Sequence, residues 1–588
     1  MTILQELAVL YERRAEDEDW PKPGFSKEKI GAFVLLDNKG SVRDIRSLMA
    51  PDDKDKLRPR LMSVPNPVKR TSGITPNTLW DKSAYVLGIT ETESGPGQKK
   101  RTLDEHAEFK RKHLALLECA DDKELIAFRN FCYSWTPAQF VNFPDAIPLV
   151  DQNMVFMLDD GSYLHELPAA RTLLRKNDLG EKVCLVTGQK GSVARLHPSI
   201  KGVMDAQPTG ASLVSFNKPA DTSHGMKQGD NAPVSEEAAF AYSTALNAML
   251  ARGSGNSVNV GDDTVVFWAD KPEVEWTIDA LLSGVDDSAA EVELRAQVKA
   301  IAEGKLRANE PLDPNTRMFV LGLTPNSARL SVRYWYPGTL RGFAMAITEF
   351  WSDCVIKPSP FERDGRDVLP KPRAFLSDLA VQGNTKNISS RLGGDLMRAI
   401  LTHGRYPATM LYSVIARIRV EGEPERKNRR VDGRRAALIS AVLRRNYKQE
   451  VPMALDEMAT DAAYLLGRLF GAYAYAEKSY QDRGAGLRQK YLAAASATPA
   501  RIFPVLMRGY EHNLASLRKA GGLKAGVGVK ADQAVSAIIA RLPGNRELPV
   551  ALPLEEQGRF FVGFYHQFSA FYTKADNASD TNKNGGNS

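Results

Sequence analysis

The chain lacks the features that mark exported, membrane-spanning or disulfide-stabilised proteins. Its 588 residues include only four cysteines, and no two of them form a CxxC pair. Disulfide frameworks and structural zinc sites need such clustering, so we expect neither, and a reducing compartment fits. No stretch approaches the roughly 18 consecutive apolar residues of a membrane-spanning helix. The first residues, MTILQELAVLYERRAEDED, carry charges through their apolar positions, which is not typical of a signal peptide. We therefore expect a cytoplasmic protein without a membrane partner.

Local motifs for catalysis are missing as well. No Walker A loop is present to cradle a triphosphate, because GQKGS at 188–192 lacks the required spacing and the lysine–hydroxyl pair. No two of the eight histidines stand four residues apart, as a zinc protease needs, and there is no GxSxG elbow. Acids and histidines do not cluster locally as they do around the metals of a nuclease. We expect no catalytic residue, no metal and no cofactor, and a nuclease site assembled from distant acids remains the alternative.

A mild excess of positive charge is what the chain has instead. It contains 78 Lys and Arg against 71 Asp and Glu, a formal net charge of +7, with 43% hydrophobic residues. These values are typical of a globular protein with several domains. A small average charge permits nucleic-acid binding without requiring it, so the location of the cations decides the question.

The apolar pattern changes near residue 376. Before that point, short apolar runs alternate with turn-forming residues, and Ser235 is a good N-cap for one long helix. We expect strands at Ala32–Leu36, Val183–Thr187, Ser212–Phe216 and Thr264–Ala269. After it, apolar residues recur at helical spacing, and an aromatic stripe on the last helix predicts packing between helices. The predicted fold class is α+β: a mixed α/β N-terminal body with long ordered loops (1–375), a basic helical connector (376–452), a C-terminal helical bundle (453–574) and a disordered tail (575–588).

The segment Pro65–Gly88 is the first candidate nucleic-acid loop. Its three prolines and one glycine before Leu79 keep it out of regular helix, yet it is dense in cations, hydroxyls and an amide. Cations neutralise phosphates, whereas hydroxyls and amides fix position or read base edges. The alternative is that the hydroxyls form turns and the cations are only solvated. The candidate residues are Lys69, Arg70, Thr71, Ser72 and Asn77.

The segment Gly202–Tyr242 is the second candidate loop. A loop of about 30 residues usually has a functional or ordering reason, and its small residues allow a backbone to approach a ligand closely. Glutamine and asparagine can make paired hydrogen bonds to adenine or read minor-groove acceptors. The alternative is a long ordered loop packed on the body. The candidate residues are Gln207, Thr209, Ser212, Asn217 and Lys218.

The third cationic feature is the stretch Arg417–Lys448. It holds eleven Arg and Lys against four acids, a local charge of +7 that equals the formal charge of the whole chain. Runs of charge are usually solvated faces, but this density also fits a phosphate-facing surface. The candidate DNA-binding residues in it are Arg429, Arg430, Arg434 and Arg435.

Several sequence blocks resemble a known family. They include PVKRTSGITPNTLWDKSAYVLG, LVTGQKGSVARLHPSIKGV, GASLVSFNKPADTSHGMKQGDNAPVSEEAAFAY, FVLGLTPNSARLSVRYWY, RLGGDLMRAIL, AYLLGRLFGAY, YLAAASATPARIFPVL and LPLEEQGRFFVGFYHQ. Together they span most of positions 1–570. The chain resembles the large subunit of the type I-C CRISPR surveillance complex (Cascade), the subtype first labelled for Desulfovibrio vulgaris.

The resemblance implies a non-catalytic, RNA-guided role in antiviral defence. The large subunit of such a complex recognises a short protospacer-adjacent motif (PAM) in double-stranded DNA, promotes unwinding and R-loop formation, holds the displaced strand and recruits the helicase–nuclease. Guide RNA reaches it mainly through the complex. The other implied partners are the backbone subunits, the repeat-processing endoribonuclease subunit, and small subunits made from the chain's own C-terminal region, with Met453 or Met458 as the internal start.

The resemblance turns the first two candidate loops into hypotheses. The Pro65–Gly88 residues are predicted to contact PAM-proximal DNA, and the Gly202–Tyr242 residues to read base edges or to wedge the first unpaired step. Two rival functions stay open: a metal-dependent nuclease with a dispersed acidic site, and a scaffold subunit that binds only protein.

Overall fold

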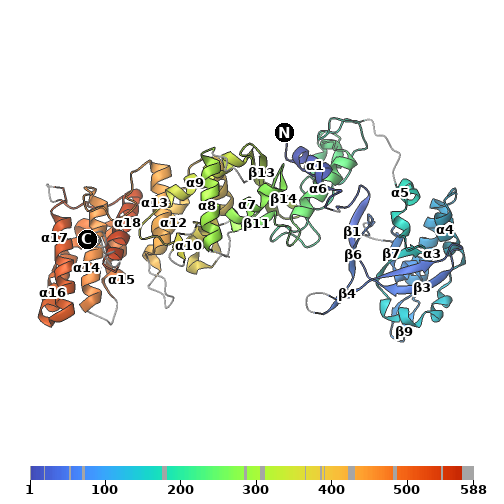
Figure 1. The fold of residues 1–588 in the computed structure, drawn as a ribbon, viewed down its shortest axis with the longest axis horizontal. Helices are drawn as coiled ribbons and strands as arrows, with labels where there is room; N and C mark the ends of the chain where they lie inside the picture. Colours follow the sequence, from blue (N-terminus) through green and yellow to red (C-terminus); the bar gives the residue numbers. More distant parts are fainter. Residues whose placement is uncertain are drawn as a thin grey trace, which may run out of the picture. The chain divides into compact units, whose positions relative to one another are not determined.

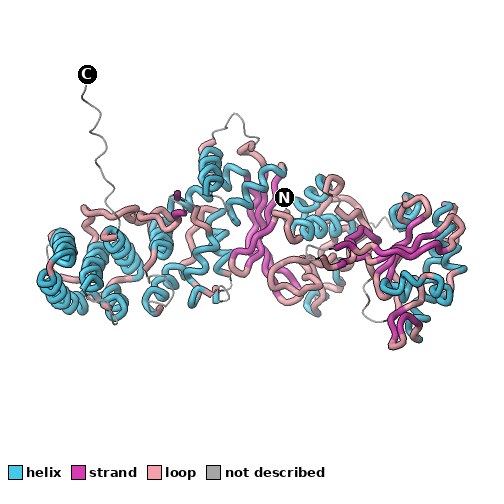
Figure 2. Tube along the Cα trace, turned by 60° about the horizontal axis from the view of Figure 1, so that its bottom comes forward, coloured by secondary structure: helices cyan, strands magenta, loops and turns pink. Residues whose placement is uncertain are grey.

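The computed structural model describes most of the chain in two compact units. The described residues are 2–18, 20–51, 55–68, 70, 73–174, 182–283, 288–304, 312–363, 366–367, 369–384, 387–389, 391–421, 431–480, 486–543 and 547–572. Unit 1 comprises Met1–Pro198 and Val214–Ala248, and unit 2 comprises Ser199–Leu213 and Met249–Ser588. The mixed α+β fold class with a helical C-terminal region is confirmed (Figure 2). The predicted boundaries at 376 and 453 stay predictions, and the predicted tail at 575–588 lies outside the described residues.

Unit 1 is built around a four-stranded mixed sheet. Its strand order is β3-β2-β10-β7, with β10 parallel to β2 and the other neighbours antiparallel (Figure 1). The central strand β2 is apolar throughout and mostly buried, as expected of a strand packed on both faces. The strands are β2 (Ala32–Leu36), β3 (Val42–Ser47), β7 (Trp80–Lys82) and β10 (Asn153–Leu158).

Two helices pack aromatic side chains into the core of this sheet. α3 (Lys100–Leu116) and α4 (Lys123–Ser134) contribute Phe109 and Phe128, and the ring centroids of Phe128 and Phe156 of β10 lie 4.6 Å apart. Asp122 caps α4 by accepting a hydrogen bond from the Leu125 N–H at 3.1 Å. The other elements of the unit are α1 (Ile3–Arg14), α2 (Ser83–Val86), β8 (Thr90–Thr92), β9 (Gly95–Gly97), α5 (Pro168–Leu174) and most of α6 (Glu236–Met249).

A separate two-stranded ribbon projects beside this sheet. β1 (Phe25–Ile30) pairs antiparallel with β6 (Arg60–Pro65), and β4 (Ala50–Pro51) pairs with β5 (Leu57–Arg58) in the connection between β3 and β6 (Figure 1). Met62 and Val64 of the ribbon belong to a small apolar cluster that also includes Trp80. The ribbon is therefore packed against β7, the strand within the first candidate segment.

Two of the four strand predictions are wrong, and two are confirmed. Ala32–Leu36 is β2, and Thr264–Ala269 lies within β12 (Asp263–Ala269). Residues 183–187 instead fold into a turn, in which the Cys184 N–H donates to the Gln189 carbonyl at 2.8 Å and Gly188 has a φ of +72°. Residues 212–216 make one isolated bridge and then leave the sheet. Apolar composition predicts burial, whereas pairing along a strand depends on partners far away in the chain.

Unit 2 begins with a fully antiparallel sheet in the order β11-β12-β13-β14. Val265 and Phe267 of β12 belong to a continuous core with the helices that follow. Ser235 caps α6 of unit 1 as predicted, since its Oγ accepts a hydrogen bond from the Ala238 N–H at 3.2 Å. The strands are β11 (Ser257–Val260), β12, β13 (Arg317–Asn326) and β14 (Arg329–Thr339), with short β15 (Glu362–Arg363) and β16 (Arg366–Asp367).

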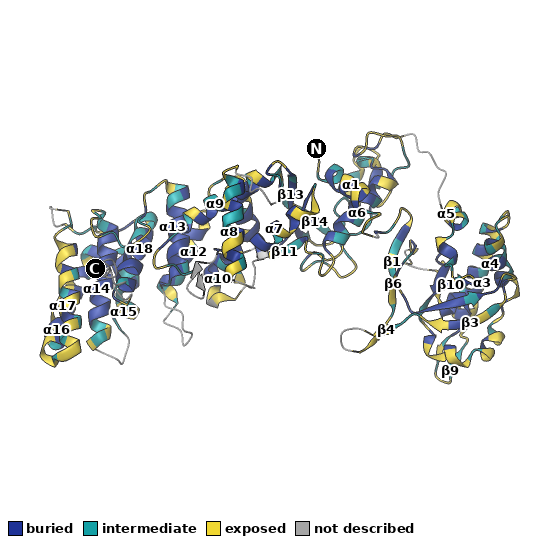
Figure 3. Cartoon of the chain, in the orientation of Figure 1, coloured by how far each residue is buried: buried dark blue, intermediate teal, exposed yellow. Residues whose placement is uncertain are grey.

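The rest of unit 2 is helical. Two long helices, α14 and α18, pack side by side, and the rings of Phe470 and Phe564 meet edge to face across them with ring centroids 5.8 Å apart (Figure 3). The aromatic stripe on the last helix is thus buried between helices, as predicted. The helices are α7 (Pro272–Ser283), α8 (Ser288–Ala302), α9 (Leu340–Asp353), α10 (Pro372–Leu379), α11 (Leu392–Leu401), α12 (Thr409–Val420), α13 (Gly433–Tyr447), α14 (Ala462–Tyr480), α15 (Leu487–Ala497), α16 (Pro499–Ala520), α17 (Gly522–Ile539) and α18 (Leu554–Ala570).

Candidate nucleic-acid interface

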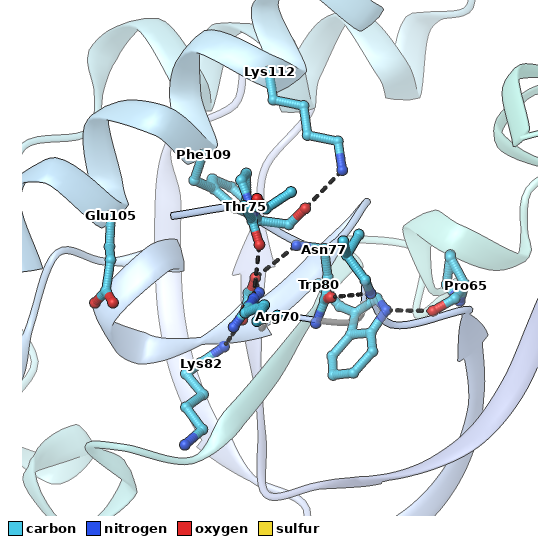
Figure 4. A network of polar contacts seen from close by, with 12 residues as sticks. Pro65, Arg70, Thr75, Asn77, Trp80, Lys82, Glu105, Phe109 and Lys112 are labelled. Carbon is cyan, nitrogen blue, oxygen red and sulfur yellow. Dashed lines mark hydrogen bonds and ion pairs between the residues drawn. The ribbon is translucent and has the colours of Figure 1, made fainter. Parts of the chain in front are cut away.

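The first candidate loop is organised around a buried carboxylate, Asp81 of β7. Its side chain is 1% exposed. It accepts hydrogen bonds from the backbone N–H of Asn77 at 2.7 Å and of Lys82 at 2.9 Å, and it pairs with the guanidinium of Arg70 (Figure 4). Buried charges are retained where they are paired and hydrogen-bonded. Asp81 therefore holds both ends of the 70–82 segment together.

Arg70 and Asn77 both act inside this loop. The Arg70 Nε donates to the Thr75 carbonyl at 2.7 Å, and its guanidinium carbon lies 4.3 Å from the centroid of the Tyr85 ring. The Asn77 Oδ1 accepts a hydrogen bond from the Val68 N–H at 2.9 Å, and Asn77 is 5% exposed. Both residues thus have partners within the loop, and their contact with DNA stays a prediction. Lys69, Thr71 and Ser72 lie outside the described residues.

Helix α3 anchors the loop from the side. The Lys112 Nζ donates to the Pro76 carbonyl at 2.7 Å (Figure 4). The His113 Nε2 accepts from the Leu79 N–H at 2.9 Å while its Nδ1 lies 2.8 Å from the Phe109 carbonyl, so the ring is neutral with its proton on Nδ1. Leu79 has a φ of +64°, a left-handed conformation that costs energy for a branched residue. The contact with His113 holds this strained residue in place.

Burial dominates the electrostatics of the loop. It raises the pKa of the Asp81 carboxyl, against the lowering effect of the Asn77 and Lys82 N–H groups and of Arg70. It lowers the pKa of the Lys112 ammonium, and it lowers the pKa of His113 to about 3. The hydrogen bonds of Asp81, Lys112 and His113 to backbone groups of the loop hold its described residues in one conformation.

The second candidate loop begins with a hairpin that belongs to unit 2. Ile200 and Ala211 exchange two backbone hydrogen bonds of 2.8 and 2.9 Å, and the Met204 N–H donates to the Thr264 Oγ1 of β12 at 2.9 Å. At the turn, the Gly210 N–H donates to the Gln207 carbonyl at 2.8 Å, and Gly210 has a φ of +93°. The hairpin 200–211 is thus docked on the sheet with a tight turn at its tip.

The predicted residues of this loop divide between the two units. Gln207 and Thr209 lie exposed at the hairpin tip. Ser212 follows and bridges to the edge strand β14, with its N–H donating to the Ala328 carbonyl at 3.0 Å. Asn217 and Lys218 are exposed residues of unit 1, where the Lys218 N–H donates to the Asp221 Oδ2 at 2.9 Å. The structure therefore brings the first three residues together on unit 2 and places the other two on unit 1.

In the third feature, the cationic stretch 417–448, several of the described arginines pair with acids of unit 2. Arg434 pairs with Asp378 at 2.6 Å and Arg435 pairs with Glu421 at 2.5 Å. Arg435 is 9% exposed, and Arg445 is buried with its Nε 2.6 Å from Asp353. DNA binding by Arg434 and Arg435 stays a prediction, and Arg429 and Arg430 lie outside the described residues.

A line of cations on α16 is absent from the sequence prediction. Arg501, Arg508 and Lys519 are all exposed. Their spacings of 7 and 11 residues at about 100° per residue bring them within about 20° of one face, over about 27 Å of helix. The described stretch 486–543 holds nine Arg and Lys against two acids. The signal was present in the sequence as a helical spacing of cations, but it was spread too thinly to appear as a charge run.

The described residues contain no group of three His, Cys, Asp or Glu side chains placed to hold a metal ion. Within the same part of the chain, no helix combines the length and apolarity needed to cross a bilayer. The described residues do contain two loops with backbone hydrogen bonds to their surroundings and a cationic face on α16.

Comparison with known families decides the broad identity. Residues 7–572 match the family described as CRISPR-associated protein (Cas_Csd1). The chain belongs to this family. No curated protein matches the chain's sequence. Membership in Cas_Csd1 confirms the CRISPR-associated character implied by the sequence blocks, and the match covers both structural units and all three candidate surfaces.

Proposed function

We propose that this Cas_Csd1 protein is the non-catalytic large subunit of a type I-C CRISPR surveillance complex. In this role it recognises the PAM in double-stranded DNA, promotes unwinding and R-loop formation, holds the displaced strand and recruits the helicase–nuclease. The observation that carries the proposal is the family match over residues 7–572. In RNA-guided recognition, base pairing with the guide reads the target and the protein reads only a short motif.

The braced loops support the recognition step. Base-reading side chains need a backbone that is ordered before DNA arrives, because ordering a flexible loop on binding costs affinity. The hairpin 200–211 meets this condition, since its backbone is bonded to Thr264 and is followed by the bridge to β14. Its tip exposes Gln207 and Thr209, side chains suited to base edges or to insertion at an opened step.

The cationic helix face supports the holding of a displaced strand. Non-specific binding of single-stranded DNA relies on a row of cations that follows the backbone. Arg501, Arg508 and Lys519 form such a row on α16. We place the displaced strand there, together with the predicted surface at Arg429, Arg430, Arg434 and Arg435.

The proposed partners follow from the same role. Guide RNA is bound mainly through the complex, which also contains the backbone subunits, the repeat-processing endoribonuclease subunit and small subunits made from this chain's own C-terminal region. Met453 and Met458, the predicted internal starts, are exposed and lie shortly before α14. Translation from either methionine would retain all of α14–α18.

The test is duplex binding by the assembled complex with its guide RNA. Wild type is expected to prefer one short motif beside the guide-matched sequence over its mutated forms. Gln207→Ala combined with Asn217→Ala is expected to reduce that preference by about tenfold, the worth of one bidentate pair of hydrogen bonds to a base, while binding to unrelated duplex DNA changes less than twofold. Electrophoretic mobility shift with matched and mutated motifs measures both.

Gln98→Ala is the matched control, because Gln98 is an exposed glutamine of unit 1 outside both loops. Equal losses on specific and unrelated DNA would show that Gln207 and Asn217 do not read sequence. Cleavage of DNA by the purified chain with a divalent metal would instead support the nuclease alternative, and an assembled complex without DNA affinity would support the scaffold alternative.

A further inference from the structure

The ribbon β1–β6 carries a face of its own that none of the loops above includes. It is a sheet of only two strands, and its register runs from Phe25 opposite Pro65 to Ile30 opposite Arg60. Side chains alternate between the two faces of a strand. Lys27 and Lys29 therefore share a face with the residues opposite them, Ser63 and Leu61.

The two faces of the ribbon have different surroundings. On the inner face, Met62 and Val64 are buried in the apolar cluster that contains Trp80. On the outer face, Lys27 and Lys29 are exposed and Leu61 is 62% exposed. The described residues 25–30 and 55–65 hold five Lys and Arg against two acids, so the ribbon and its extension are cationic.

The ribbon is held firmly in unit 1. The Asn153 Nδ2 of β10 donates to the Lys29 carbonyl at 2.9 Å. At the other end, the Trp80 Nε1 donates to the Pro65 carbonyl at 2.7 Å, and the Asn66 N–H donates to the Gly24 carbonyl at 2.8 Å. Pro65 and Trp80 both belong to the first candidate segment, so this hydrogen bond ties the ribbon directly to that segment.

The dimensions of the ribbon match a groove of duplex DNA. Two strands lie about 4.8 Å apart, and six residues extend about 17 Å. The major groove of B-DNA is about 12 Å wide and admits a two-stranded ribbon. Lysines neutralise phosphates on the groove walls, whereas a protein partner would favour fewer lysines, because lysine is depleted from protein–protein interfaces.

We infer that the outer face of the ribbon, formed by Lys27, Lys29, Leu61 and Ser63, is a second contact with duplex DNA on the far side of the PAM from the guide-paired sequence. Its location beside the Pro65–Gly88 loop sets this position. The inference rests on the proposed function, since it requires a duplex engaged by that loop. The ribbon supplies affinity through phosphates, and the loops supply the choice of motif.

The test compares two guide-matched duplexes in the assembled complex. One ends directly beyond the PAM, and the other continues for about 15 base pairs, about 50 Å. Wild type is expected to bind the longer duplex more tightly. Lys27→Gln combined with Lys29→Gln is expected to remove about tenfold of that advantage and to lower the slope of log affinity against log salt by about 1.8, or about 0.9 for each phosphate that is no longer neutralised. Motif preference is expected to stay at the wild-type level.

Lys100→Gln combined with Lys123→Gln is the matched control, since both lysines are exposed in the first turns of α3 and α4 of the same unit. Equal binding of both duplexes by wild type, an unchanged salt slope in the ribbon variant, or failure of that variant to assemble with the other subunits would each overturn the inference. Wild type without motif preference would overturn the proposed function instead, which separates the two failures. An unaltered thermal unfolding midpoint of the ribbon variant verifies that the ribbon is still folded.

Discussion

At the scale of single residues, two buried polar groups set the conformation of the first candidate loop. Asp81 collects two backbone N–H groups and the Arg70 guanidinium. His113 accepts from the N–H of Leu79, a residue with positive φ. Each of these side chains accepts hydrogen bonds from N–H groups that are buried away from water. An unpaired buried donor would cost about 1–3 kcal/mol. The loop is therefore stabilised by two side chains that are themselves buried.

The buried state of His113 predicts a pH dependence of stability. Its folded pKa of about 3 lies below the ordinary value of about 6.5. As the pH falls below about 6.5, the unfolded chain takes up a proton that the folded chain does not. The stabilisation is thus complete above about pH 6.5 and falls by about 1.4 kcal/mol per pH unit down to the folded pKa. Urea titrations near pH 7 and pH 5 are expected to show a smaller loss for His113→Gln than for wild type, by about 2 kcal/mol.

His512→Gln is the control for this measurement, because His512 is exposed on α16 and its removal leaves the buried histidine in place. It is expected to lose as much stability as wild type on acidification. If His113→Gln lost as much stability as wild type between pH 7 and pH 5, His113 would have to be protonated in the folded protein. That result would contradict the assignment of a single proton to Nδ1.

At the scale of elements, close packing of α14 on α18 depends on glycine. A Cβ at Gly467 would lie 1.9 Å from the Phe560 carbonyl oxygen, and a Cβ at Gly563 would lie 2.1 Å from the Tyr464 carbonyl oxygen. Neither position allows a side chain without separation of the helices. Glycine weakens an isolated helix by about 1 kcal/mol relative to alanine, so these two glycines are explained by the contact between helices and not by helix formation.

Alanine is expected to change the free energy of unfolding in opposite directions at Gly467 and at Gly509. Gly467→Ala is expected to lower the free energy of unfolding by about 1–3 kcal/mol, because overpacking forces the two helices apart. Gly509→Ala in α16 is expected to raise it by up to about 1 kcal/mol, since its added Cβ would meet no atom within 4 Å beyond the backbone of its own helix and its two chain neighbours. Chemical denaturation measures both variants, and a stabilised Gly467→Ala would contradict the packing of α14 on α18.

At the scale of the whole molecule, the location of positive charge is the property that matters for function. Among the described residues of 417–448, Arg434 and Arg435 pair with Asp378 and Glu421 of unit 2. The helical region 486–543 has nine cations and two acids, with three of the cations aligned on α16. Burial raises the pKa of Asp378 to about 6, so removal of its arginine partner would leave a costly carboxylate inside the protein.

Two sets of alanine substitutions separate these roles. Arg501→Ala, Arg508→Ala and Lys519→Ala together are expected to weaken single-stranded DNA binding and to lower its salt slope by about 2, or about 0.7 per neutralised phosphate, without a change in thermal unfolding midpoint. Arg434→Ala with Arg435→Ala is expected to lower that midpoint. An unchanged salt slope in the first set would place the displaced strand elsewhere on the protein.

The fold class and the two loops that carry candidate residues could be predicted from the sequence. Helical periodicity after residue 376, the strand Ala32–Leu36 and the Ser235 cap are local properties, because each depends on residues within a few positions of one another. The two candidate loops were also recognisable from their proline, glycine and polar composition. Residues 183–187 and 212–216 were wrongly predicted as strands, because a strand needs a pairing partner elsewhere in the chain: 183–187 closes a local turn instead, and Ser212 finds only one bridge, to Arg329.

By itself, the sequence determined the broad class of the protein. The change to helical periodicity near residue 376 indicated an α+β protein, and the sequence blocks that resemble the family indicated a CRISPR-associated protein. Both are properties of the order of residues along the chain. Only the tertiary structure decided which cations face solvent. Arg434 meets Asp378 from 56 residues away. Lys27 and Lys29 are exposed on one face of their ribbon, and Met62 and Val64 are buried on the other face. Burial and ion pairing are set by long-range packing, and no local pattern in the chain encodes them.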